Sequence, residues 1–188
     1  LWSKILEAYS VKEENQKIFI HGKTSKFNQT FFDPFVNSLR TTTEAFSAIV
    51  GGVDSLQTNA YDESFNQSDD FARRLARNTQ IILKEESHLD QVIDPAGGSY
   101  FVEKLTDEIA NAAWKLFQTI EKEGGMLKAI QSGFVQDEIA KIAEAKKKDF
   151  AKRKSVLVGT NMYANPKEEM MEINKTDLNA IYKKRVEF

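Results

Sequence analysis

Apolar residues in this chain switch between strand-like runs and helix-like spacing. Residues 17–24 contain an Ile-Phe-Ile run typical of a short strand that is covered on both faces. Residues 53–61 are a second strand candidate, and residues 91–93 are a very short third. Because helical periodicity follows each candidate, the order favours parallel strands joined by right-handed crossovers.

Helical periodicity is clearest at about residues 101–122, where Leu105, Ile109 and Leu116 belong to a repeat of about 3.6 residues. Ser68 is expected to cap an earlier helix, with acidic residues in its first turn. A last apolar piece, residues 155–159, is either a strand or simply extended. The remaining helices are expected over residues 2–9, 35–50, about 68–86, 126–131, about 136–154 and about 177–184.

Three strand–helix units do not close a barrel, and alone they would leave two sheet edges open. The order therefore predicts an α/β fragment of a larger structure, and the alternative is a small open sheet complete in itself. The chain starts at Leu1 rather than Met and lacks the basic-then-apolar order of a signal peptide. We therefore interpret it as the middle of a longer protein.

Composition removes several classes of function. With 188 residues, 41% hydrophobic and 29% charged, the chain resembles an ordinary globular protein, and its net charge of −2 provides no bulk attraction to nucleic acid or anionic membranes. The absence of cysteine excludes thiolate sites, and two histidines argue against a His-rich metal centre. No apolar run approaches the roughly 20 residues that span a bilayer. We expect a cytoplasmic protein without metal, nucleic-acid or membrane partners.

Candidate chemistry lies after the strands, because ligands of parallel α/β folds bind at the carboxyl ends of strands. His21 could be a hydrogen-bonding or acid–base group, or a core histidine bonded to backbone. Lys23 could meet an anionic group or be solvated, and Ser55 and Asn59 could bind a ligand or cap turns. These residue types leave both interpretations open.

Two further features carry little chemistry of their own. Asp62 and Glu63 would point to opposite faces of an extended chain, which argues against shared acid–base work. Gly97 and Gly98 are not followed by the Gly-Lys-Ser/Thr of a phosphate-binding loop.

Read together, the loops resemble the methylmalonyl-CoA mutase family. The motifs occur in the family's order, without gaps over long stretches, and they cover roughly residues 17–163. They are HGKTS at 21–25, DPFVN at 33–37, RTTTEA at 40–45, DSLQTN at 54–59, ARNTQ at 76–80, DPAGGSY at 94–100 and GGMLKAI at 124–130.

The resemblance implies the C-terminal part of a (β/α)8 barrel, about three βα units with extra C-terminal helices. Residues 1–163 would belong to that barrel, and residues 164–188 would lead toward a cobalamin-type domain. The parent enzyme would use adenosylcobalamin and an acyl-CoA substrate, whereas no cofactor is expected on this chain alone. A mutase large subunit or a second copy of the chain would be its protein partner.

The resemblance also assigns roles to individual residues. His21 matches the active-site histidine of the family's R-x-H-x-Q-T-S-G motif, and Ser55 matches a serine that contacts CoA. Glu63 matches an acid near the corrin ring, and Lys23 and Asn59 are the other substrate-binding candidates.

Three departures from that motif qualify these roles. Phe19 replaces its Arg, Lys23 replaces its Gln, and Lys26 replaces its Gly. The resulting pattern is closer to the small subunit of heterodimeric mutases, which does not bind cobalamin, and we interpret the chain as part of such a subunit. The alternatives are a catalytic mutase with another acyl preference, in which Lys23 contacts a substrate carboxylate, and a self-contained α/β module that binds a ligand or partner.

Overall fold

The computed structural model describes residues 1–173 and 177–186 and contains two compact units. One unit comprises Leu1–Ile20 with Asp94–Val156, and the other comprises His21–Ile93 with Leu157–Phe188. No helix in the described ranges combines the length and apolar character needed to cross a membrane.

The first unit is helical. Long helices were predicted here, and α4 lies within one residue of its predicted start while α5 has the predicted bounds. Gly125 and Gly133, both at positive φ, precede α5 and α6, a backbone conformation that glycine adopts without steric cost. Its elements are α1 (Trp2–Ala8), a 3₁₀ turn (Glu13–Asn15), α4 (Tyr100–Lys122), α5 (Met126–Gln131) and α6 (Phe134–Ala151).

The apolar stripe of α4 is open to solvent, whereas the sequence predicted a buried face. Leu105, Ile109 and Leu116 are 42%, 60% and 51% exposed. An amphipathic stripe is covered only where a second apolar surface lies against it, and periodicity alone does not supply that surface.

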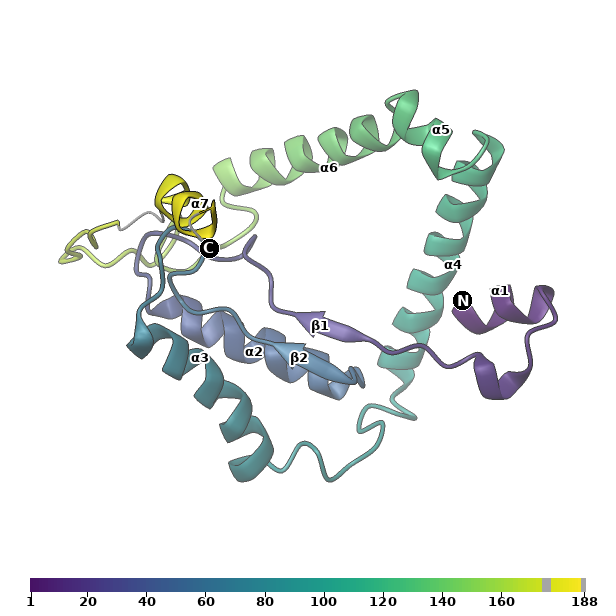
Figure 1. The fold of residues 1–188 in the computed structure, drawn as a ribbon, viewed down its shortest axis with the longest axis horizontal. Coiled ribbons are helices and arrows are strands. Elements are labelled where there is room, and N and C mark those ends of the chain that lie inside the picture. Colours follow the sequence, from purple (N-terminus) through teal and green to yellow (C-terminus); the bar gives the residue numbers. More distant parts are fainter. Residues whose placement is uncertain (174–176, 187–188) are drawn as a thin grey trace. The chain divides into compact units, whose positions relative to one another are not determined.

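The second unit holds two parallel strands, β1 (His21–Lys23) and β2 (Ser55–Gln57), shown beside α2 (Val36–Val50) and α3 (Asp70–Ile81) in Figure 1. α3 continues into a π-helical segment, Ile82–Glu86. The parallel pairing that the sequence predicted is confirmed, and the chain is a mixed α/β protein.

Both strands are shorter than predicted, and residues 91–93 are not a strand in the described structure. Ile18 and Phe19, expected to be buried in the first strand, precede β1 and are 52% and 72% exposed. Among the described residues each strand pairs with one neighbour, and the paired stretch is three residues long in each strand.

Alternation along the strands separates two faces of the sheet. A Cβ on Gly22 would lie 3.2 Å from Val53 and 3.3 Å from Leu56, so Gly22 and Leu56 share a face. Thr58, two residues after Leu56, donates to the Ala76 carbonyl of α3, and Leu56 borders a cavity lined by residues of α2, so both helices lie on that face. His21 and Ser55 therefore lie on the opposite face, since successive side chains of a strand alternate.

Asp69, rather than the predicted Ser68, caps α3. The Asp69 carboxylate accepts the Ala72 amide at 2.7 Å, while the Ser68 hydroxyl donates to Asp62 at 2.6 Å. Either side chain can cap a helix, but the Ser68 hydroxyl bonds the buried Asp62 carboxylate and Asp69 takes the capping role.

Within the second unit, the segment that precedes α7 (Leu178–Val186) contacts the part of the unit that holds the sheet. Arg40 donates to the Val158 carbonyl, and the Glu168 carboxylate accepts the Asp33 amide. Met171 packs against the small core of Ala60, Tyr61 and Ala72. In the predicted strand at residues 155–159, Val158 forms one isolated bridge, with Met162.

Tyr61 makes the stability of this unit sensitive to alkaline pH. Burial, and then the Asp62 and Asp69 carboxylates, raise the pKa of Tyr61 above its ordinary value of about 10. The folded state holds the phenolic proton more tightly, so this stabilisation is complete below the unfolded pKa and is lost as pH rises through the folded pKa. The urea midpoint should fall more from about pH 9 to about pH 11 in wild type than in Tyr61→Phe. Equal falls would contradict this role.

Candidate functional site

Four polar residues form a ladder on the sheet face that points away from α2 and α3. His21 pairs with Ser55 and Lys23 with Gln57 in the parallel register, and the two-residue period places all four on one face. We call His21, Lys23, Ser55 and Gln57 the polar ladder. It gathers three of the five predicted site residues.

The closest contact in the polar ladder is a hydrogen bond between His21 Nδ1 and Ser55 Oγ, at 2.6 Å. His21 is exposed and Ser55 is half-buried, so a molecule at this face can reach the imidazole. Lys23 is also exposed. The ladder therefore offers an imidazole, a hydroxyl, an ammonium and an amide, which suit a ligand with carbonyl and anionic oxygens.

Asn59 lies apart from the ladder. Its side-chain amide donates to the Thr24 carbonyl at 2.7 Å, and its backbone amide donates to the Thr24 hydroxyl at 2.8 Å. The Thr24 amide in turn donates to the Gln57 carbonyl, which adds one backbone hydrogen bond between the two chain segments beyond the end of β1. Asn59 is 1% exposed, and its buried Oδ1 has no hydrogen-bond partner in the described structure. Its geometry joins the two strand exits, and its role with substrate stays a prediction.

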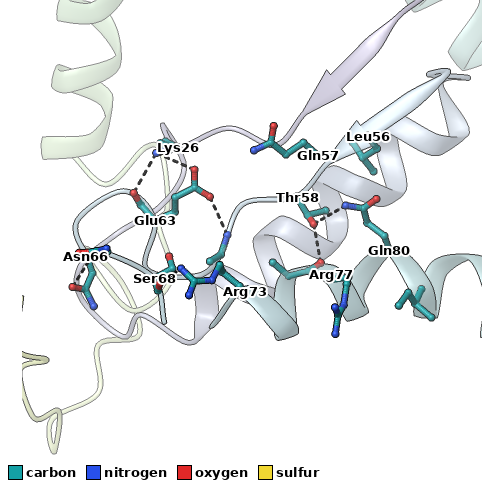
Figure 2. A pocket seen from close by; sticks show the side chains of 14 residues that line it. Lys26, Leu56, Gln57, Thr58, Glu63, Asn66, Ser68, Arg73, Arg77 and Gln80 are labelled. Atoms are coloured by element: carbon teal, nitrogen blue, oxygen red, sulfur yellow. Dashed lines mark hydrogen bonds and ion pairs between the residues drawn. The ribbon is translucent and has the colours of Figure 1, made fainter. Parts of the chain in front are cut away.

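Glu63, the fifth predicted residue, is engaged by Lys26. Lys26 Nζ lies 3.1 Å from Glu63 Oε1 and 3.3 Å from the Glu63 carbonyl, and Figure 2 shows the two side chains pointing toward each other. Glu63 Oε2 also accepts the Ala60 amide at 3.3 Å. The neighbouring Asp62 is 2% exposed and binds Ser68, so the adjacent carboxylates serve different partners.

The Lys26–Glu63 pair borders a pocket of about 710 Å³ between the end of β2 and α3 (Figure 2). Within it Gln80 donates to the Thr58 hydroxyl at 3.0 Å, and that hydroxyl donates to the Ala76 carbonyl at 2.7 Å. Arg77 also lines the pocket, so its lining combines charged and amide side chains with apolar ones. The described residues contain no group of three or more side chains suited to hold a metal ion.

Asn37 holds the loops behind these strand exits. It is completely buried, and its amide nitrogen donates to the carbonyls of Thr30 and Tyr61, each at 2.8 Å. Its Oδ1 accepts the Thr30 amide at 3.1 Å and Arg40 Nη1 at 2.7 Å. Burial lowers the pKa of Arg40, and Asp33 opposes that shift.

Sequence reasoning missed Gln57 and Asn37. Gln57 lies two residues after Ser55, so strand alternation could have identified it once the register with Lys23 was known. Asn37 occurs within the DPFVN motif, but a buried asparagine that bonds a loop 24 residues away leaves no local sequence signal.

Comparison with known proteins gives the wider relationship. A family description of methylmalonyl-CoA mutase matches residues 1–188. The chain belongs to the methylmalonyl-CoA mutase family. It is 43% identical over 167 residues to the methylmalonyl-CoA mutase small subunit of Porphyromonas gingivalis, covering 88% of this chain and 27% of that protein. It is 39% identical over 188 residues to the large subunit of the same organism, covering 100% and 26%. The Escherichia coli methylmalonyl-CoA mutase is 38% identical over 178 residues, covering 94% and 25%.

The resemblance predicted from the loop motifs is thus confirmed at the level of the family. This mutase-family chain spans about a quarter of the length of the curated relatives that it matches. Small and large subunits match at similar identities, 43% and 39%, so identity by itself does not assign the subunit.

Proposed function

We propose that this chain forms part of the acyl-CoA-binding (β/α)8 barrel of a methylmalonyl-CoA mutase, with the polar ladder on the barrel's inner face. The parallel register His21↔Ser55 and Lys23↔Gln57 carries the proposal, because it gathers four polar side chains opposite the helix-covered face. In a (β/α)8 barrel the helices lie outside and the opposite face of the sheet lies inside. A barrel wall of this kind would bind and orient an acyl-CoA and keep water from it.

The family implies adenosylcobalamin in the parent enzyme, where it supplies the radical chemistry. The residues at these strand exits do not fit a corrin ring. By the family resemblance, Lys26 stands where a glycine lets the ring approach the backbone, and its side chain extends to Glu63, the acid expected near that ring. An ion pair at this position would block that approach, and we assign no step of this chain to the cofactor.

We therefore propose that the chain comes from a non-catalytic small subunit that supports a cobalamin-binding large subunit. Residues 1–163 would be its barrel part and residues 164–188 a connection, in a cytoplasmic setting. The exposed stripe of α4 supports a protein partner, since apolar stripes of this kind need cover. Lys23 supports a second candidate: on the polar ladder its ammonium could meet a substrate carboxylate in a catalytic mutase of different acyl preference.

A cobalamin titration of a full-length subunit that carries this chain tests the proposal. We expect the subunit alone to leave the absorption spectrum of adenosylcobalamin unchanged and to turn over no acyl-CoA. Mixed with its large subunit, it should form a complex that changes this spectrum and turns over acyl-CoA. Spectral titration and a coupled acyl-CoA assay measure the two properties.

Lys26→Gly and Lys154→Gly provide a matched pair for the same titration, since Lys154 is exposed and lies outside the unit that holds the sheet. Tight cobalamin binding and turnover by the subunit alone would contradict the small-subunit proposal and favour the catalytic candidate.

A further inference from the structure

The turn that follows β1, residues 25–28, is held by a single carboxylate, and we call it the exit turn. Glu44 on α2 accepts the Ser25 backbone amide on Oε2 and the Asn28 side-chain amide on Oε1, each at 2.7 Å. A carboxylate accepts stronger hydrogen bonds than a neutral oxygen does, and both bonds have the short length of charge-assisted ones. The exit turn is therefore fixed at both ends, with Lys26 between the two bonded residues.

Lys26 reaches Glu63 from the exit turn, and the pair it forms is open to water. Lys26 Nζ lies 3.1 Å from Glu63 Oε1 and 3.3 Å from the Glu63 carbonyl, and the two side chains are 48% and 28% exposed. An exposed ion pair contributes little by itself, because water screens the charges and a long side chain loses conformational freedom when it is held. The position of Lys26 therefore depends on how its backbone is held, and the Glu44 bonds hold that backbone.

We propose that Glu44 is a positioning residue that orders the exit turn and so keeps Lys26 against Glu63. Glu44 bonds the turn on either side of Lys26 and acts on the ion pair through it. While the turn is ordered, the Glu63 carboxylate is engaged by Lys26 rather than by a ligand. In a mutase small subunit this arrangement would help to keep a corrin ring away from the strand exits, and that consequence alone rests on the proposed function.

Acetylation of lysines with acetic anhydride, followed by mass spectrometry of a full-length subunit, tests the proposal. A nitrogen held by a carboxylate and a carbonyl reacts more slowly than a free one, and the exposed Lys23 in β1 provides the reference rate. Glu44→Gln keeps the size of the side chain but leaves one oxygen for two donors. We expect it to raise the rate of Lys26 relative to Lys23 roughly 2- to 5-fold, the factor that corresponds to the free energy of an exposed ion pair.

Three further variants separate positioning from a general loss of structure. Asn28→Ala removes one of the two bonds to Glu44 and should also raise the relative rate of Lys26. Glu63→Gln removes the carboxylate that Lys26 contacts and should raise it as well, and adding Glu44→Gln to it should raise it little further, because both changes act on one ion pair. Glu144→Gln removes an exposed carboxylate of α6, outside the unit that holds the sheet, and should leave the rate unchanged.

The outcomes distinguish this inference from the proposed function. An unchanged relative rate of Lys26 in Glu44→Gln or in Asn28→Ala would overturn the positioning role. An equal rise at Lys23 and Lys26 would also overturn it, because it would mean that the whole unit had loosened. A selective rise at Lys26, together with tight cobalamin binding by the wild-type subunit alone, would instead overturn the small-subunit proposal and leave the positioning role in place.

Discussion

Replacing Asn37 with Ala is expected to lower the free energy of unfolding of the sheet-containing unit by about 3–5 kcal/mol. The side chain is completely buried and makes four hydrogen bonds, to the backbone of Thr30 and Tyr61 and to the Arg40 guanidinium. Alanine leaves these buried groups without partners, and each such group costs about 1–3 kcal/mol. Urea unfolding, followed by hydrogen exchange at the Thr24 amide that bonds Gln57, measures the loss.

Asn28→Ala is the matched control. Asn28 is exposed and donates to Glu44 Oε1 at 2.7 Å, so its removal should change stability by no more than about 0.5 kcal/mol. Equal losses of stability in Asn37→Ala and Asn28→Ala would contradict the role of Asn37 in holding the loops behind the strand exits.

Reversing the charge of Lys23 is expected to weaken acyl-CoA binding with little effect on stability. A hydrogen bond to a charged group contributes about 1.5–3 kcal/mol, so Lys23→Glu should reduce affinity by roughly 10- to 100-fold or more, because it adds repulsion to the lost contact. Lys23 is exposed, and surface substitutions of this kind change stability by about 0.5 kcal/mol. Calorimetric titration of a full-length subunit with an acyl-CoA gives the affinity, and urea unfolding gives the stability.

Lys152→Glu makes the same change of charge at an exposed position outside the unit that holds the sheet. It separates a local contact from a general effect of net charge, which falls equally in both variants. Similar affinities for Lys23→Glu and Lys152→Glu would remove Lys23 from the binding face.

The helices were predictable because their evidence is local. Apolar spacing and flanking glycines were enough to locate α4 and α5 to within a residue. The strands were located but predicted too long, since the length of a strand depends on its partners and each described strand has one. For the same reason residues 91–93, which have no strand to pair with in the described structure, remain outside any described strand.

The candidate site divides in the same way. Motif resemblance pointed to His21 and Ser55, and the parallel register brings them into contact. The partners of Asn59 and Glu63 lie 35 and 37 residues away in the chain, so sequence reasoning could not foresee that Thr24 and Lys26 engage them. Such contacts depend on which loops the fold places together, and the register of β1 and β2 determines this.

Photo-crosslinking of a full-length subunit with a CoA thioester that carries a photoreactive acyl group would show most directly whether the polar ladder lines an acyl-CoA tunnel. We predict that mass spectrometry will find the label on ladder residues, chiefly His21 and Lys23, and that excess unlabelled acyl-CoA will suppress it. Label confined to the helix-covered face around Leu56, or to the outer surfaces of α2 and α3, would contradict a barrel whose inner wall is built by β1 and β2.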